Sequence, residues 1–417
     1  MPTALLIASF DSQLKWCAGI RSELTSHGFE CRTVTPDTRN ALSPQQIADA
    51  GFGSIERMTW DELVTAARHS DVVVSALAGP ATQRLTIDLS RELADIGGPG
   101  PVIVSGWVGI IIEKLTAGYL DRCGTDVVAV NSAHDLANFK DVAARLSIPD
   151  DNLVLAGLPF VSSSPRPARD GPIRTVLFAD QPTVPRSFHE RRHVYQRLID
   201  YALVHPDREV LLKPRHRIGE DTFHTMLHHP EDVLAGVPTP PNFRIDYTAI
   251  SQSLPHVDLL LTLSSTACLE AIDHGCRVAL VLDLGVHERH GNHVFMDSGM
   301  LRTFDQIVND EIGVPDPAWV RGYFSGREGN ANQIIVDRVA KLLADDERPS
   351  RGVWASPYFR STTQLSDVED SYKPTWRAKA WGRRVRKHGV LIGTASHLAN
   401  LWFPPVLVRA VQALRRR

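Results

Sequence analysis

Short apolar runs alternate with longer amphipathic stretches along most of this 417-residue chain. Thr3–Ser9 and Asp71–Leu77 read as strands, and each is followed by a segment with helical periodicity, Ser12–His27 and Ala81–Ile96. Apolar strands separated by helices are typical of parallel sheets that are layered with helices. The pattern therefore predicts an α/β protein.

The alternation occurs in two series, separated by a polar, proline-rich segment without periodicity. We predict an N-terminal Rossmann-like domain over residues 1–160 that binds an acceptor, and a linker over residues 161–173. A second Rossmann-like domain is predicted over residues 174–350, closed by a helix at Gln333–Leu343. Two such sheets imply a cleft between the domains, where ligands meet the carboxyl ends of strands.

Composition narrows the class of protein. Hydrophobic residues make up 43% of the chain and charged residues 22%, which is ordinary for a soluble globular protein. The net charge of −3 provides no overall basic field for nucleic acid. The five cysteines are widely spread and form no C-x-x-C pair, so neither a disulfide framework nor a thiolate zinc site is indicated. The chain begins with a strand-like run rather than a signal peptide, and a cytoplasmic protein is expected.

Ser264, Ser265 and Thr266 lie between a predicted buried strand, Val257–Leu263, and a helix-like segment that begins at Ala267. A helix start leaves backbone N–H groups without intrahelical partners, and the three hydroxyls add further donors. Such a turn at the carboxyl end of a strand suits a phosphate. The alternative is that one of the serines only caps the helix.

A cationic element begins at the last residue of the predicted strand Glu209–Lys213, in the order Lys213-Pro214-Arg215-His216-Arg217. Lysine and arginine beside a histidine can bind an anion through charge and through the guanidinium fork. The proline fixes the backbone where the cationic side chains leave the sheet. The alternative is a solvated basic loop before the next predicted helix, Asp221–His228.

Asp11 follows the first predicted strand. At the mouth of a cleft its carboxylate would be the catalytic base that takes a proton from an acceptor hydroxyl. The alternative is that Asp11 caps the helix after it. Gly106–Gly109, after strand Val102–Ser105, either contacts an acceptor or packs against its surroundings.

His189–His193 reads H-E-R-R-H, the pattern of zinc proteases. Ser187 and Glu190, however, form a capping-box pattern at a helix start. The adjacent arginines indicate a solvated first turn rather than a buried catalytic helix. A metalloprotease is therefore not favoured.

The segment His287–Gly299 follows a further strand and should lie at the same sheet edge as the serine cluster. His290 and Asn292 are its candidates for hydrogen bonds to an anionic or sugar ligand. A plain solvated loop and a metal site are the alternatives. The chain contains neither G-x-x-x-x-G-K-[ST] nor G-x-G-x-x-G, which counts against an NTPase and a dinucleotide enzyme.

These elements resemble those of bacterial GT-B glycosyltransferases. Lys213–His216 is similar to the K-x-H-P element of capsule-type transferases, and Ser264–Thr266, followed by Leu269–Ala271 and Gly275, is similar to their Ser-Ser element. The group includes bacterial sialyltransferases and CDP-glycerol glycerophosphotransferases. The Phe178–Pro182 turn also resembles the corresponding strand-to-turn segment of these transferases. The chain is further similar to an uncharacterised actinobacterial family of glycosyltransferases.

The resemblance implies two Rossmann-like domains facing across a cleft, with a nucleotide donor held by the second. The candidate donor-binding residues are Gln181, Lys213, Arg215, His216, Ser264, Ser265, Thr266, Glu270, His290 and Asn292. The implied reaction moves a sugar from a nucleotide-sugar donor to a glycan or lipid-linked acceptor. Neither a cofactor nor a metal is predicted.

The extension over residues 351–417 is basic: Pro374–Arg417 contains ten Lys and Arg and no acidic residue. Tryptophans among these cations suit an anionic cytoplasmic membrane surface. A helical tail packed on the domains and a nucleic-acid contact are alternatives. For the whole chain, a nucleotide-sugar 2-epimerase and a non-catalytic membrane-associated binding protein are the competing functions.

Overall fold

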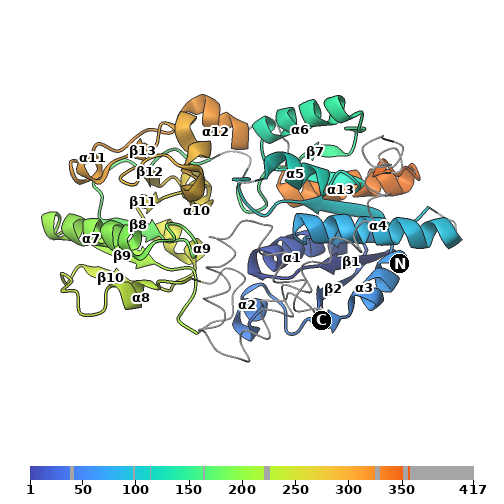
Figure 1. Cartoon of the computed structure of the whole chain (residues 1–417), viewed down its shortest axis with the longest axis horizontal. Helices are drawn as coiled ribbons and strands as arrows, with labels where there is room; N and C mark the ends of the chain where they lie inside the picture. The colour runs from blue at the N-terminus through green and yellow to red at the C-terminus, as the bar shows by residue number, and fades with distance from the viewer. Residues whose placement is uncertain are drawn as a thin grey trace, which may run out of the picture. The chain divides into compact units, whose positions relative to one another are not determined.

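The computed structural model of the chain describes residues 1–37, 42–96, 99–112, 114–162, 165–219, 226–324, 329–350 and 356. Within these residues the strands form two sheets, parallel throughout, with helices between successive strands (Figure 1). The predicted α/β fold of two Rossmann-like halves is thereby confirmed. The basic extension, apart from Ser356, and most of the helix predicted at Asp221–His228 lie outside the described residues.

The first sheet has the strand order β3-β2-β1-β4-β5-β6-β7 in the described part of the chain. Its strands are β1 (Thr3–Ile7), β2 (Glu30–Pro36), β3 (Glu56–Met58), β4 (Val72–Ser75), β5 (Val102–Gly106), β6 (Val127–Val130) and β7 (Leu153–Leu155). The helices between them are α1 (Asp11–Ser26), α2 (Pro44–Asp49), α3 (Trp60–Arg68), α4 (Gly79–Ile96), α5 (Leu115–Leu120) and α6 (Ala133–Leu146).

The second sheet has the order β10-β9-β8-β11-β12-β13, again for the described residues. Its strands are β8 (Thr175–Ala179), β9 (Glu209–Lys213), β10 (Phe243–Ile245), β11 (Leu259–Thr262), β12 (Arg277–Val281) and β13 (Leu301–Arg302). Its helices are α7 (Phe188–Val204), α8 (Pro230–Val233), α9 (Ile250–Ser253), α10 (Ala267–Asp273), α11 (Phe304–Val308) and α12 (Pro317–Phe324), with 3-10 turns η1 (Leu254–His256), η2 (Glu288–His290) and η3 (Asn292–Ser298).

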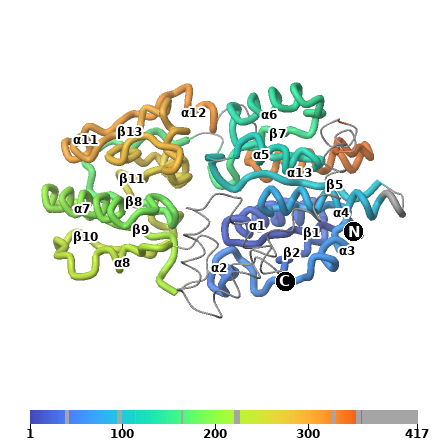
Figure 2. Tube along the Cα trace, viewed as in Figure 1, coloured from blue at the N-terminus to red at the C-terminus, as the bar shows by residue number. Residues whose placement is uncertain are grey.

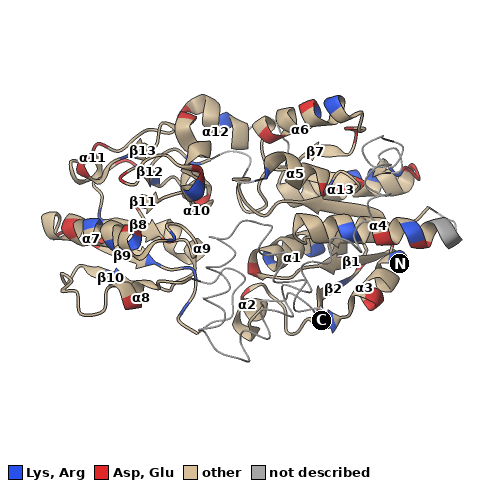
Figure 3. Ribbon diagram, in the orientation of Figure 1, with Lys and Arg blue, Asp and Glu red and all other residues tan. Residues whose placement is uncertain are grey.

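Apolar side chains cover both faces of each sheet, which is why the strands read as continuous apolar runs. In β4, successive residues contribute to opposite faces: Val72 and Val74 pack with α1, and Val73 packs with α3 and α4. Side-chain capping bonds mark the starts of some of the helices, including α2, α3 and α6. In α3, Thr59 and Glu62 form a reciprocal capping box. Acidic and basic residues are interspersed on the helices of both halves, in keeping with the small net charge (Figure 3).

The last described helix, α13 (Ala331–Ala344), packs on the first sheet. The helix was predicted at Gln333–Leu343 as the close of the second series, but Ile335, Val336, Val339 and Leu342 are buried in the core beside α1. Figure 2 shows α13 among elements of the first half. An amphipathic pattern indicates that a helix has an apolar face, but it does not indicate which sheet that face packs against.

The segment predicted as a linker is attached to the second half. The guanidinium group of Arg169 donates to the carbonyls of Leu254, Val257 and His274, at 3.1, 2.6 and 3.2 Å. Ile173 is buried in the core of the second sheet. These contacts fix the C-terminal end of the segment on that sheet. Within the described residues, no helix has both the length and the apolar character needed to cross a membrane.

Candidate functional site

A buried ion pair fixes the turn that follows β8. The side chains of Asp180 and Arg191 are 0% and 1% exposed, with Arg191 Nη1 2.9 Å from Asp180 Oδ2. The guanidinium also donates to the carbonyls of Gln181 and Pro182, and the Tyr195 hydroxyl donates to Asp180. Charges can remain buried when each has such partners. The backbone of Gln181 is thereby held in place at the carboxyl edge of the sheet.

Three neighbouring strands end at the same level of this edge. Lys213 of β9 is in register with Ala179 of β8, and the Thr262 hydroxyl of β11 donates to the Ala179 carbonyl at 2.8 Å. Neighbouring strands are about 4.8 Å apart. The cationic element after β9 and the hydroxyl turn after β11 therefore leave the same edge, roughly 10 Å apart at the strand ends.

The serine turn is built into the loops around it. Ser264 is fully buried, and its backbone N–H donates to Gln181 Oε1 at 3.0 Å. The Ser264 hydroxyl lies within hydrogen-bond distance of the same oxygen and of the His290 carbonyl. The Ser265 hydroxyl accepts from the N–H of Ala267, so this side chain serves the helix start that was one predicted alternative. Ser264 therefore positions the turn, while Ser265 and Thr266 are partly accessible.

Thr266 contacts a loop of the first half. Its hydroxyl accepts from the N–H of Ile110 at 3.2 Å. Gly109 allows this approach, because a Cβ at that position would lie 3.0 Å from Thr266 Oγ1. The Asn131 side chain donates to the Gly109 carbonyl and holds the loop. The Gly106–Gly109 turn, for which packing and acceptor contact were the two alternatives, leads directly into this contact.

The cationic element faces the N-terminal end of α1. Arg215 Nη2 lies 3.1 Å from Asp11 Oδ1, and the two side chains are 44% and 23% exposed. Asp11 does not cap α1: the N-cap position is occupied by Phe10, and Asp11 is the first helical residue. His216 is buried, and its carbonyl lies 3.1 Å from His229 Nε2. The candidate base and a candidate phosphate-binding residue are thus in direct contact.

Two ionisable groups near this contact have shifted pKa values. Burial raises the pKa of Glu270 on α10 to about 7, and the charges of Lys15 and Arg215 oppose the rise. Burial also lowers the pKa of Lys213, where nearby Asp246 opposes the shift and Lys15 reinforces it. Lys15 of α1 therefore lies close to two candidate donor-binding residues of the second half. Perturbed groups in such proximity are typical of functional sites.

The histidine loop contains two buried polar side chains. Asn292 donates to the Gly285 carbonyl and accepts from the His287 N–H, so its amide stabilises the loop itself. The His290 side chain is 1% exposed and lies 3.6 Å from Glu190 Oε1, measured from Nε2. Neither ring nitrogen of His290 has a hydrogen bond within the described residues. Burial lowers the pKa of this imidazole, which favours the neutral form.

Two predictions for the H-E-R-R-H stretch are wrong. Ser187 occupies the N-cap of α7 but makes no side-chain capping bond, and the Glu190 carboxylate lies beside Arg289 and His290 instead of bonding back to the N-cap. Of the two arginines expected in a solvated first turn, only Arg192 is exposed, and Arg191 is buried in the ion pair with Asp180. In the described residues, no group of three His, Cys, Asp or Glu side chains is placed to hold a metal.

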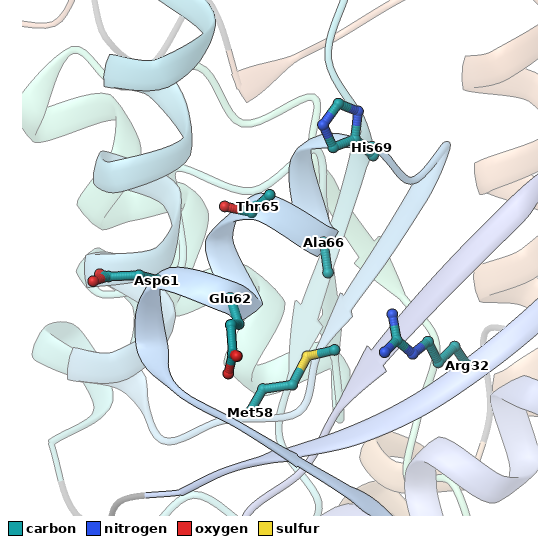
Figure 4. Close-up of a pocket in the computed structure, with 7 residues that line it drawn as sticks. All are labelled: Arg32, Met58, Asp61, Glu62, Thr65, Ala66 and His69. Carbon is teal, nitrogen blue, oxygen red and sulfur yellow. The ribbon is translucent and has the colours of Figure 1, made fainter.

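A surface hollow on the first half lies on β2, β3 and α3, away from these residues (Figure 4). Its lining residues are Arg32, Met58, Asp61, Glu62, Thr65, Ala66 and His69. Arg32 is engaged by Glu56, and Glu62 by its capping bonds to Thr59. Because Arg32 and Glu62 already have partners on the first half, the hollow is a weaker candidate for a ligand-binding site than the edge of the second sheet.

Sequence reasoning missed Lys15 and Glu190. Lys15 follows Asp11 by four residues, a spacing that places both on one side of α1, and this was the available signal. For Glu190 the sequence held a misleading signal, the capping-box spacing to Ser187. Its contact with the histidine loop joins segments about a hundred residues apart, which a local pattern does not report.

Comparison with known proteins assigns the chain to a family. A family model described as "Putative glycosyltransferase (DUF6716)" matches residues 4–342. No curated protein sequence matches the chain.

Solved structures of similar fold include UDP-GlcNAc 2-epimerase from Methanocaldococcus jannaschii, with 10% identity, a TM-score of 0.53 and coverage of 82% of this chain and 100% of that one. The Neisseria meningitidis UDP-GlcNAc 2-epimerase bound to UDP-GlcNAc has 12% identity, a TM-score of 0.50 and coverage of 82% and 100%. Arabidopsis thaliana UGT89C1 complexed with UDP has 10% identity, a TM-score of 0.51 and coverage of 83% and 100%. At these identities the likeness concerns the fold.

Proposed function

The chain belongs to the family described as "Putative glycosyltransferase (DUF6716)", and from that premise we propose that it transfers a sugar from a nucleotide-activated donor to a glycan or lipid-linked acceptor without a metal ion. The observation that carries the proposal is the convergence at one sheet edge. Lys213 and the Ser264–Thr266 turn lie at the ends of β9 and β11, the two strands that flank β8, and Arg215 contacts Asp11 of the first half. Cations, hydroxyls and a carboxylate are the groups that glycosyl transfer from a phosphate requires.

In the proposed mechanism, Lys213 and Arg215 bind the donor phosphate, and Ser265 and Thr266 donate hydrogen bonds to its oxygens. Asp11 takes the proton of the acceptor hydroxyl as the acceptor oxygen bonds to the anomeric carbon. The bond from that carbon to the phosphate oxygen breaks, and its electron pair stays on the phosphate. The cations stabilise the negative charge that grows there.

The remaining candidate residues act around this centre. Gln181 and Ser264 hold two turns together, and Asn292 holds the loop that carries His290. The neutral ring of His290 and the carboxyl group of Glu270 are proposed to bind the sugar or nucleoside part of the donor. His216 supports the cationic element through its backbone contact with His229.

Product analysis with UDP-, GDP-, CMP- and CDP-linked sugars tests the function. A transferase releases free nucleotide, whereas a 2-epimerase returns an isomeric nucleotide-sugar. The second outcome is a real alternative, because UDP-GlcNAc 2-epimerases share the fold. The Lys213→Met/Ser265→Ala variant is expected to bind the donor about 10- to 100-fold more weakly, since a hydrogen bond to a charged group contributes about 1.5–3 kcal/mol. Unchanged donor affinity in this variant would remove the basis of the proposal.

We also propose that the basic extension attaches the protein to anionic membranes, where a lipid-linked acceptor would be found. Each Lys or Arg near such a surface contributes about 1 kcal/mol. The full-length chain should float with vesicles that contain phosphatidylserine, and a chain ending at Asp370 should not. Neutral vesicles are the control for charge. Equal flotation of the two chains would contradict membrane attachment through this segment.

A further inference from the structure

Lys15 lies on the face of α1 that meets the second half. Residues four apart share a helix face, and Asp11, one turn before Lys15, contacts Arg215 at 3.1 Å. Lys15 is exposed, whereas Leu14 and Trp16 beside it are buried in the core. The apolar face of α1 therefore packs on the first sheet, and the Lys15 side chain points away from that core.

The charge of Lys15 acts on two groups of the second half. It is among the causes that lower the pKa of Lys213, and it opposes the rise in the pKa of Glu270. Both effects require the ammonium group to lie near Lys213 at the end of β9 and near Glu270 of α10. Arg215 is a third cation in the same region, where it is paired with Asp11.

Like charges held together raise the free energy of the protein unless an anion compensates them. Lys15 forms no ion pair with a carboxylate of the described residues. Lys213 is half-buried, and the carboxylate that acts on it is Asp246, at the end of β10. One anion with several oxygens, such as a diphosphate, could contact the two ammonium groups and the Arg215 guanidinium together.

We propose that Lys15 is a further phosphate-binding residue, contributed by the first half to a donor that the second half holds. This inference rests on the proposed function. Because Lys15 comes from the other half of the chain, it links donor binding to the helix that begins with the candidate base Asp11. The substrate class that follows is a nucleoside diphosphate-sugar rather than a monophosphate-sugar, because three cations match the larger charge and span of a diphosphate.

The test compares Lys15→Met with Lys140→Met, an exposed lysine on α6. Affinities for UDP, GDP, CDP, ADP, CMP and inorganic pyrophosphate are measured by calorimetry. Lys15→Met should weaken the best diphosphate ligand at least 10-fold and leave CMP less affected, while Lys140→Met should behave as wild type. Equal diphosphate affinity in Lys15→Met and wild type overturns the inference and leaves the proposed function standing.

A second readout does not require any ligand. The titration of Lys213, followed by NMR of ¹³C-methylated lysines, should move to a higher pKa in Lys15→Met, because a neighbouring positive charge is removed. It should not move in Lys140→Met. An unchanged Lys213 titration shows that Lys15 is not part of this site and overturns the inference. If wild type binds none of the probes, the proposed function fails, and this inference with it.

Discussion

Replacing Arg191 by leucine is expected to lower the free energy of unfolding by about 3–5 kcal/mol. The change leaves the Asp180 carboxylate buried without its cation and frees the carbonyls of Gln181 and Pro182. An uncompensated buried charge destabilises the folded state by far more free energy than burial of the leucine side chain contributes. Urea unfolding at pH 7 measures the difference.

The adjacent Arg192 provides a matched control, because it is the same residue type in the same helix turn and is exposed. Arg192→Leu should change stability by less than about 0.5 kcal/mol. Adding Asp180→Leu to Arg191→Leu should recover part of the loss, since an apolar pair can replace a buried ion pair. If Arg191→Leu and Arg192→Leu unfold at the same urea concentration, the ion pair does not hold the β8 turn.

Glu270→Gln is expected to stabilise the protein above pH 7. The pKa of Glu270 is raised by burial to about 7, so ionisation is harder in the folded state than in the unfolded chain. Between pH 5 and 7 the unfolded chain therefore binds fewer protons than the native state, and stability falls as pH rises. Glutamine removes this dependence. The stability advantage of the variant should grow by about 2–3 kcal/mol between pH 5 and pH 8.

Urea unfolding at several pH values measures this advantage, with Glu30→Gln at an exposed position as the control. Donor affinity should fall in Glu270→Gln while stability rises, which is the relation expected of a carboxyl group kept for binding rather than for folding. A pH-independent difference between the variant and wild type would show that Glu270 ionises normally.

The sequence was sufficient to predict which residues lie at the carboxyl edge of the second sheet. It was insufficient to predict contacts between segments that are distant in the chain. Lys213 and Ser264 could be placed because each lies at the carboxyl end of an apolar strand, and the carboxyl ends of parallel strands meet at one edge. Arg191 could not be distinguished from Arg192, since both belong to a charged helix start and only packing decides which one turns inward. Lys15 depends on how α1 faces the end of β9, a relation between residues some two hundred positions apart. The two-residue strand β13 is too short to give any periodic signal.

The return of α13 to the first sheet means that the two halves are not two consecutive pieces of chain. A fragment of residues 174–350 would carry the apolar side of α13, including Ile335 and Val339, without the surface that buries it. A fragment of residues 1–160 would leave that surface open. Neither cut yields an independent folding unit, and a soluble acceptor-side fragment would need residues 331–344 joined back to the N-terminal segment. The protein's halves thus depend on each other through a helix that follows the whole second sheet in the sequence.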